Sequence, residues 1–153
     1  MKTLAREPDT AEILRRLRAL RHDSTRRWGR MSAHQMVCHL SDGYRLLTGE
    51  RTTELAPTPL PRVMMRLIAL YVPVRWPADI PTTPDLDQNV GGTKPAHFDA
   101  DVSELARLLT EIATDRRGRL DGHLHPIFGR MSEPAWLRWA YLHADHHFRQ
   151  FGL

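Results

Sequence analysis

The stretch FGRMSEPAWLRWAYLHADHH, residues 128–147, decides the fold. Ser132 stands where a helix N-cap is expected, and Pro134 follows in the first turn, where its missing N–H group costs nothing. Apolar residues then recur at helical spacing to the end of the stretch. The sequence therefore predicts a helix that begins at Ser132 and extends close to the C-terminus, with His143 and His147 on one face.

A five-residue phrase occurs twice, as WGRMS at residues 28–32 and with phenylalanine for tryptophan at residues 128–132. After the first copy, Ser32 and Gln35 have the spacing of a capping box, which predicts a second helix that begins at Ser32 and ends at Gly49. Five residues are too few to establish gene duplication. The repeat still supplies two equivalent helix starts, from which positions along both helices can be compared.

Three histidines project from the same side of their helices relative to the two caps, Ser32 and Ser132. At about 100° per residue, His39 and His143 both lie within roughly 20° of the direction of their own cap, and His147 stays on the same face. The rise of about 1.5 Å per residue puts His39 and His143 at nearly the same level if the two helices are antiparallel. All three also fall in the apolar stripes of their helices and are expected to point inward.

Three imidazoles that converge in a helical core predict a metal site. Each buried ring needs partners for two polar nitrogens, so such a set packs poorly. A pair at i and i+4 on one helix and a third ring from a facing helix suit Zn²⁺ or a similar divalent ion, and leave a coordination position for water or substrate. The alternative is that His39, His143 and His147 are ordinary core or surface histidines, hydrogen-bonded to side chains and water.

The rest of the chain also favours helices. Three further segments have apolar residues at helical spacing: from Asp9 or Thr10 to about Arg26, from Pro61 to Tyr71, and from the cap pair Asp101 and Glu104 to near Gly118. The segment 61–71 is apolar nearly all round, so we expect it to be buried or to contact a partner. Residues 73–100 are expected to form a long ordered loop. No strand pattern competes, so we expect an all-α antiparallel bundle with one long crossover, in a single domain of residues 1–153.

Composition limits the class of protein. The only cysteine is Cys38, which excludes a disulfide framework and a thiolate zinc cluster and favours a reducing, cytoplasmic setting. On the predicted helix Cys38 points about 100° away from His39, so we expect a packed thiol. The N-terminus lacks the apolar core of a secretory signal, and the longest apolar run is too short to span a bilayer. We therefore expect a soluble protein with no membrane partner.

The net charge of +4 and the seven arginines between positions 15 and 30 raise the question of nucleic-acid binding. These arginines alternate with apolar residues at helical spacing, which predicts the solvated face of an amphipathic helix; the apolar residues are Ile13, Leu14, Leu17 and Leu20. Phosphate binding would require the basic face to continue onto neighbouring elements. We favour the interpretation that the arginines lie on a solvated face. Nucleic-acid binding through this helix is kept as the least favoured of the alternative functions.

Two segments resemble the DinB-like superfamily of metal-binding four-helix proteins, most closely a small, functionally uncharacterised branch. The weaker match is the segment Ser32 to Leu40, which contains QMVCHL. The specific one is HPIFGRMSEPAWLRWAYLHADHHFRQFGL, residues 125–153, with His143, His147 and Gln150 in the order H-x-x-x-H-x-x-Q. The resemblance implies an up-down-down-up bundle whose second and last helices are antiparallel, with a long crossover between its second and third helices.

The resemblance also implies ligands and chemistry. The metal triad would be His39, His143 and His147. Gln150 and His125 would contribute to cofactor binding: Gln150 would orient a ligand or a bound water, and His125 would line the cleft, the alternative being that His125 is a turn residue. Better understood relatives are transferases and isomerases that use mycothiol, bacillithiol or a similar low-molecular-weight thiol, with a divalent metal such as zinc or nickel that lowers the pKa of the bound thiol or water. The expected function is a metal-dependent transferase or hydrolase-like enzyme that acts on a small-molecule substrate. The alternative is a non-enzymatic metal-binding or stress-related bundle.

Several other side chains are candidates for lesser roles. His146 is expected to support the site or to contact a partner, and Asp145 to be solvated or paired with an arginine. Lys94 and Gln88, in the long loop, are candidates for a lid. Apolar residues of the segment 61–71 suit a homodimer contact, and a monomer that buries them against the long loop fits equally well.

Overall fold

The computed structural model describes residues 1–78, 80–114 and 119–153. Within these residues the chain is mostly helical, with one two-stranded antiparallel sheet. The elements in chain order are α1 (Glu7–Ala19), α2 (Ala33–Thr48), α3 (Arg62–Tyr71), the 3-10 helix η1 (Pro84–Leu86), α4 (Phe98–Thr114), β1 (Leu124–His125), β2 (Gly129–Arg130) and α5 (Glu133–Gln150).

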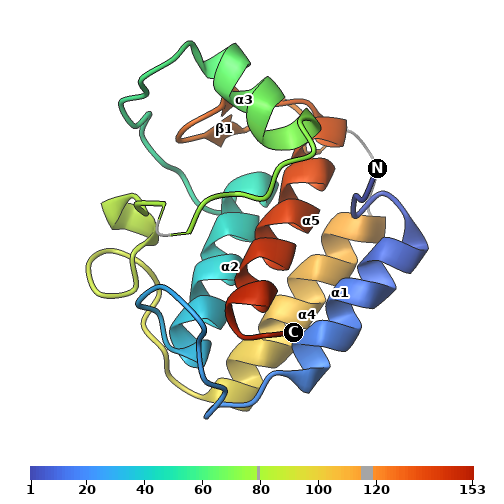
Figure 1. Ribbon diagram of the computed structural model, residues 1–153, viewed down its shortest axis with the longest axis vertical. Coiled ribbons are helices and arrows are strands. Elements are labelled where there is room, and N and C mark those ends of the chain that lie inside the picture. Colours follow the sequence, from blue (N-terminus) through green and yellow to red (C-terminus); the bar gives the residue numbers. More distant parts are fainter. Residues whose placement is uncertain (79, 115–118) are drawn as a thin grey trace.

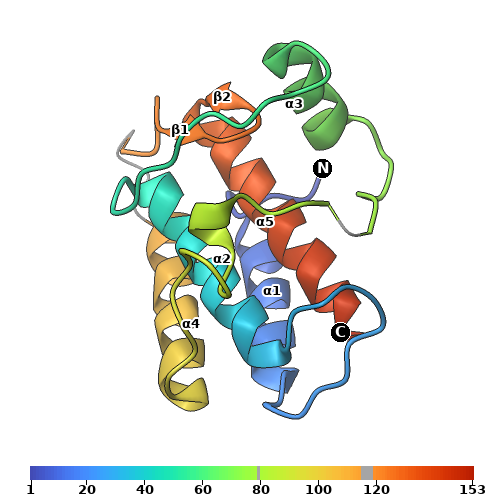
Figure 2. The ribbon, with the colours of Figure 1, turned by 90° about the vertical axis from the view of Figure 1, so that its left-hand side faces the viewer.

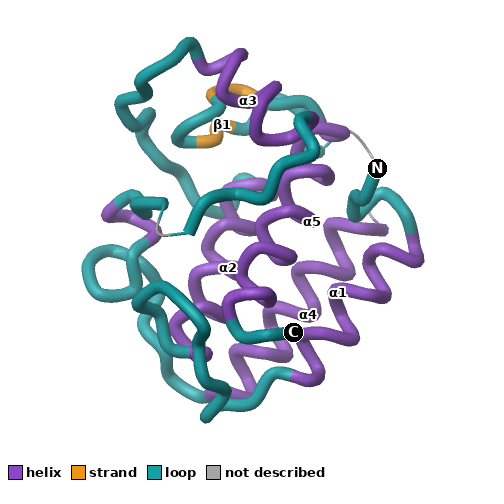
Figure 3. Tube along the Cα trace, in the orientation of Figure 1, coloured by secondary structure: helices purple, strands orange, loops and turns teal. Residues whose placement is uncertain are grey.

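Four helices, α1, α2, α4 and α5, lie side by side and enclose the core (Figures 1 and 2). The helix α3 and the hairpin of β1 and β2 lie together beyond one end of this group (Figure 3), and α3 packs against α5. All four long helices contribute fully buried side chains to the core, among them Ile13, Leu17, Met36, Leu40, Tyr44, Leu105, Leu108, Trp136 and Phe148. The apolar stripes predicted for these helices therefore face one another.

The two helices that follow the repeated phrase begin differently. Ser32 is the N-cap of α2: its Oγ accepts a hydrogen bond from the Gln35 backbone N–H (3.1 Å), and Gln35 Oε1 accepts one from the Ser32 N–H (2.9 Å). The predicted capping box is thus confirmed. Ser132 occupies the N-cap position of α5 without a side-chain capping bond, and the Glu133 N–H donates to Asp121 instead (2.5 Å). The start of α5 therefore depends on a residue from outside the repeated phrase.

Helix ends agree with the prediction in α2 and disagree in α1. Gly49 ends α2 with a φ of 79°, in the left-handed region that glycine adopts readily. The helix α1 ends before Leu20, not near Arg26, because Leu20 is extended and buried in the core. The polar residues after it form a local turn in which the Arg21 N–H donates to Ser24 Oγ and the Ser24 N–H to the Arg21 carbonyl. Such side-chain bonds compete with helix propagation.

Two predicted helix starts are also too late in the sequence. The helix α1 begins at Glu7, and α4 begins at Phe98, three residues before Asp101. The Asp101 carboxylate still serves the start of α4, because it accepts a hydrogen bond from the Ala96 N–H (3.2 Å). The predicted end of this helix near Gly118 lies outside the described residues.

The mostly helical prediction is confirmed, but the expectation that no strand forms is wrong at the hairpin before α5. Leu124 pairs with Arg130 and His125 with Gly129 in antiparallel register. Each strand has only two residues, which is too short to produce a recognisable alternation of apolar and polar side chains. The hairpin directs the chain from the turn at residues 119–123 into α5.

The helix α3 is not buried within the chain. Its only buried residue is Leu70, and Val63 and Leu67 are 58% and 53% exposed. The described part of the long loop does not cover Val63 and Leu67, so the alternative of burial against the loop is wrong for these side chains, and the homodimer contact stays a prediction. Residues 72–78 and 80–97 are otherwise a loop interrupted by η1, which agrees with the predicted loop 73–100 except at its last three residues, which belong to α4.

The basic N-terminal segment contains one exception to the predicted solvated face. Arg16 is 6% exposed, and its guanidinium donates to the Asp145 side chain (2.8 Å) and to the Leu153 carbonyl (2.9 Å). It therefore fixes α1 to the end of α5. Among the described helices, none is long and apolar enough to cross a bilayer.

Candidate metal centre

His39 from α2 and His143 and His147 from α5 come together between the two helices. The ring centroids are separated by 5.0 Å between His39 and His143, 4.9 Å between His39 and His147, and 4.8 Å between His143 and His147. All three side chains are buried, and one potential ligand nitrogen from each lies within 4.8 Å of the other two. The convergence predicted from helical spacing is therefore present; metal binding by this set stays a prediction.

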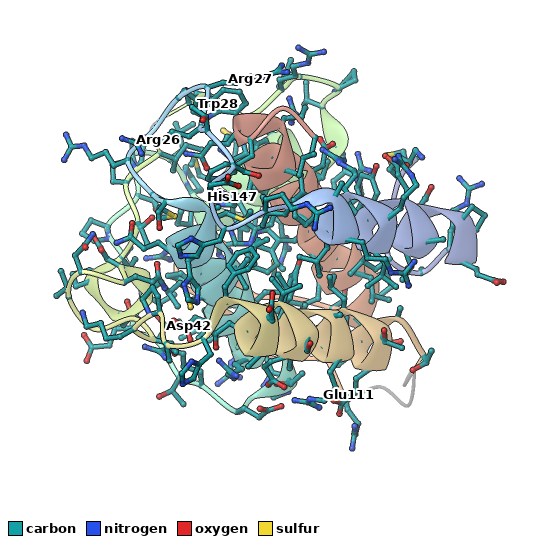
Figure 4. All side chains as sticks on the ribbon, turned by 90° about the horizontal axis from the view of Figure 1, so that it is seen from below. Arg26, Arg27, Trp28, Asp42, Glu111 and His147 are labelled. Atoms are coloured by element: carbon teal, nitrogen blue, oxygen red, sulfur yellow. The ribbon has the colours of Figure 1, made fainter. Side chains whose placement is uncertain are left out.

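The outer nitrogens of His39 and His147 are held by the protein. His39 Nδ1 lies 3.1 Å from the Leu86 carbonyl, which can only accept, so Nδ1 carries the proton. Gln150 donates from Nε2 to the Trp28 carbonyl (2.8 Å), so its Oε1 is the atom that accepts from His147 Nδ1 (3.1 Å). Figure 4 shows Trp28 on the loop before α2, which passes the end of α5, where the Arg27 N–H donates to the Gln150 carbonyl. In both rings Nε2 is left unprotonated.

His143 occupies a tighter position than the other two rings. Its Nε2 lies 3.1 Å from His39 Nε2, and its Nδ1 is buried without a hydrogen-bond partner among the described residues. On the other side, a Cβ at Gly43 would stand 3.2 Å from His143 Cε1 and 3.2 Å from Trp139. The missing side chain of Gly43 therefore leaves the space in which the His143 ring sits.

Burial sets the charge of the three imidazoles. Desolvation lowers the pKa of His39, and it lowers the pKa values of His143 and His147 well below their ordinary value, with neighbouring imidazoles acting in the same direction. The rings are therefore neutral at physiological pH. Neutral imidazole is the form that binds metal ions.

The loop that carries the Leu86 carbonyl, the partner of His39 Nδ1, is fixed to α2 by Asp42. This fully buried carboxylate accepts from Arg51 (3.1 Å), from the Thr93 hydroxyl (2.6 Å) and from Gln88 Nε2 (3.2 Å). A buried carboxylate needs such partners to remain charged. Since Asp42 lies one turn after His39 on α2, these bonds fasten the loop around η1 over the site.

Tryptophan rings surround the α5 side of the site. The Trp139 ring lies 4.5 Å from the His143 ring. The Trp76 ring lies 6.5 Å from His143 and 6.0 Å from His146, and its Nε1 donates to the Ala69 carbonyl in α3 (2.8 Å). Helical spacing could have identified Trp139, which precedes His143 by one turn. Trp76 lies in an aperiodic loop, where no local pattern indicates contact with the site.

His125, the predicted cleft residue, belongs to the aromatic packing beside the three-histidine cluster. Its Nδ1 accepts from the N–H groups of Ile127 (3.1 Å) and Phe128 (3.2 Å), and burial lowers its pKa to about 3. Its ring lies 5.0 Å from Trp139, which also contacts His143. Its predicted part in binding a cofactor stays a prediction, whereas Gln150 contacts the cluster directly through His147.

The remaining candidates have defined partners. Asp145 pairs with Arg16 (2.8 Å) and Arg149 (2.9 Å), which confirms its predicted pairing with an arginine. The Gln88 side chain is buried, and the backbone carbonyl of Gln88 accepts a hydrogen bond from Lys94 Nζ (2.6 Å). Lys94 is exposed and ties the loop around η1 from its outer side, while Gln88 lies inside; their role as a lid stays a prediction.

Comparison with family models finds a match over residues 4–152, to the family described as a protein of unknown function, DUF1569. The chain belongs to this family. Neither the curated proteins nor the solved structures contain a significant match to the chain.

Proposed function

We propose that this DUF1569 protein is a metal-dependent enzyme whose divalent ion, zinc or nickel, is held by His39, His143 and His147. One observation carries the proposal: two of these buried rings are protonated on their outer nitrogens, so their inner nitrogens have lone pairs and no proton. An N–H group at His143 Nε2 could donate to the lone pair of His39 Nε2, but it could not also donate to that of His147 Nε2. A cation would accept the lone pairs of all three inner nitrogens at once.

The distances support this ligand set. Four-coordinate zinc with nitrogen ligands at about 2.0–2.1 Å places neighbouring nitrogens about 3.3 Å apart. Nε2 of His39 and Nε2 of His143 are 3.1 Å apart. The Leu86 carbonyl and Gln150 are the outer partners that orient ligand imidazoles in metal sites, and they raise the basicity of the rings.

A divalent ion in such a site would supply Lewis acidity, which lowers the pKa of a bound water or low-molecular-weight thiol. The chain itself would orient the ligands and exclude bulk water from them. Leu86 and Gln150 keep Nε2 of His39 and His147 free of protons, and the rings of Trp76 and Trp139 shield His143. Transfer of a thiol to a small electrophile is the activity that the DinB-like resemblance implies, and hydrolysis is the alternative at the same ion.

We also infer that the family is a branch of the DinB-like superfamily. The course of the long helices in Figure 1 supports this inference, since α1 and α5 run in one direction and α2 and α4 in the other. This is the up-down-down-up order. Residues 49–97, with α3 and η1, would be the long crossover between the second and third bundle helices.

A thiol-transfer screen on metal-loaded protein tests the proposal. The protein is incubated with mycothiol, bacillithiol or glutathione and a panel of small electrophiles, and thioether formation is followed by mass spectrometry. We expect turnover that His143→Ala abolishes and that His97→Ala, a change at an exposed histidine outside the cluster, leaves unchanged. Retained metal without turnover of any pair would contradict the enzymatic proposal and support a non-enzymatic metal-binding protein.

A further inference from the structure

A second group of metal-ligand side chains lies on the opposite side of α2. His34 and Cys38 are one helical turn apart on α2, and Asp101 comes from the first turn of α4. His34 Nε2 lies 2.6 Å and Cys38 Sγ 3.8 Å from the same carboxylate oxygen, Asp101 Oδ2. The three ligand atoms lie within 4.8 Å of one another. We call these residues the mixed cluster.

The mixed cluster is separate from the three-histidine cluster, although Cys38 and His39 are neighbours in the sequence. Successive residues of a helix point about 100° apart, so Cys38 faces α4 where His39 faces α5. The two clusters also use different helices for their third ligand. Removal of either cluster by mutation therefore leaves the ligands of the other in place.

The surroundings of the mixed cluster leave a path for an ion. His34 and Cys38 are buried, whereas the Asp101 side chain is 26% exposed. The rings of His22 and Phe98 pack edge-on against His34 at 5.7 Å and 5.4 Å and form its outer wall. The cluster is thus enclosed on the core side and open at the carboxylate.

We propose that the mixed cluster is a second divalent-cation site, which takes zinc. A thiolate, an imidazole and a carboxylate together are the ligands of a borderline-soft ion, whereas magnesium and calcium prefer oxygen alone. The charges also match, because one thiolate and one carboxylate neutralise the two charges of the cation. Water supplies the fourth ligand at the exposed side of Asp101.

The hydrogen bonds of the metal-free cluster show what the ion replaces. Asp101 Oδ2 accepts from His34 and from the Cys38 thiol, so both protons lie where the cation would sit. On binding, His34 carries its proton on Nδ1, and the thiol proton passes to solvent. The 2.6 Å between His34 Nε2 and Asp101 Oδ2 then widens to about 3.3 Å, a small movement for two side chains.

Cobalt substitution tests this site independently of the three-histidine cluster. Co²⁺ occupies zinc sites and gives an intense near-ultraviolet charge-transfer band when a thiolate is a ligand, which imidazole and carboxylate do not give. Because Cys38 is the only cysteine, the band reports this cluster alone. We expect the band in the wild-type protein and in His143→Ala, and we expect Cys38→Ser to abolish it and to reduce bound cobalt by one ion per chain.

The full-length variants Asp101→Asn and His123→Ala complete the design, with folding checked by circular dichroism. Asp101→Asn should weaken cobalt binding at this site at least tenfold, and His123→Ala, at a ring that lies beside Gly49 at the other end of α2, should leave it unchanged. Absence of the band from cobalt-saturated wild-type protein overturns the proposal, as does a band whose affinity is unchanged in Asp101→Asn. If the band is present while His143→Ala leaves total bound metal unchanged, the mixed site stands and the proposed function fails.

Discussion

The three-histidine cluster and the mixed cluster have the same plan and different hydrogen bonds. In each, one helix supplies two ligands four residues apart and a neighbouring helix supplies the third. In the mixed cluster the ligand atoms bond to one another, with Asp101 accepting from His34 and Cys38. In the three-histidine cluster the protein holds the outer nitrogens of His39 and His147, and the inner nitrogens of His39 and His143 face each other.

The difference shows that spacing brings ligand side chains into one place. The hydrogen bonds around them then decide whether the ligand atoms already have partners without an ion. The mixed cluster is satisfied without metal and must release a thiol proton to bind one. Burial raises the pKa of Cys38 to about 12, and the Asp101 carboxylate acts in the same direction. The neutral three-histidine cluster has no such proton to lose. We therefore expect it to bind first.

Of the substitutions considered, His143→Ala should cause the largest change, because it removes a ligand of the three-histidine cluster and with it the stabilisation by zinc. In a Cys38→Ser background, zinc at 100 times its dissociation constant should stabilise the fold by about 2.7 kcal/mol, which raises the melting temperature by about 5–10 °C. His143→Ala should abolish this increase, and His97→Ala should preserve it. Differential scanning calorimetry measures both. An equal increase in the His143→Ala protein would place the stabilising ion elsewhere.

Gln150→Met should weaken the three-histidine cluster without removing a ligand. The variant keeps the volume of the side chain and loses the bond to His147 Nδ1, and loss of such outer partners costs about 10–100-fold in metal affinity. Competition with a fluorescent zinc chelator measures the change. The cobalt–thiolate band of the mixed cluster serves as the internal control, because Gln150 does not touch it. Equal weakening at both clusters would indicate a general loss of structure.

Gly43→Ala should distort the three-histidine cluster by packing alone. The new methyl group would meet the rings of His143 and Trp139 at 3.2 Å. We expect overpacking to outweigh the usual gain in helix propensity and to lower the free energy of unfolding by about 1–2 kcal/mol. Urea denaturation measures this change. A more stable variant would mean that the His143 ring can move aside.

The two helix starts give a smaller, matched test. Ser32→Ala should lower the free energy of unfolding by about 1 kcal/mol, because it removes a cap bond two residues before His34. Ser132→Ala should lower the free energy of unfolding by only a few tenths of the Ser32→Ala effect, since Ser132 makes no side-chain cap bond. Zinc affinity of the mixed cluster should fall in the first variant and remain in the second. Equal effects of the two substitutions would refute the difference between the caps.

The sequence predicted the parts of this site that depend on local geometry. Helical periodicity and a capping box need no distant residue, so spacing alone indicates that His39, His143 and His147 share inward faces at similar levels; their convergence also needs α2 and α5 to pack together. The start of α2 was also correct for this reason. The end of α1 was wrong because competing side-chain bonds near Ser24 carry no periodic signal.

Contacts made by loops and by helix starts could not be predicted in this way. Asp101 was interpreted as a helix cap, and its meeting with His34 depends on how α4 packs against α2. The bonds of Asp42 and Leu86 depend on the loop around η1, which has no apolar pattern. Tertiary packing, rather than local preference, brings these groups to the two clusters.

The most direct test of the account is the zinc content of the Cys38→Ser protein after equilibration with zinc and removal of free metal. Mass-spectrometric metal analysis should find about one ion per chain, and fewer than about 0.2 when His143→Ala is added. The His97→Ala control should retain the ion. A zinc content that the loss of His143 does not change would contradict the assignment of the three-histidine cluster as the metal centre.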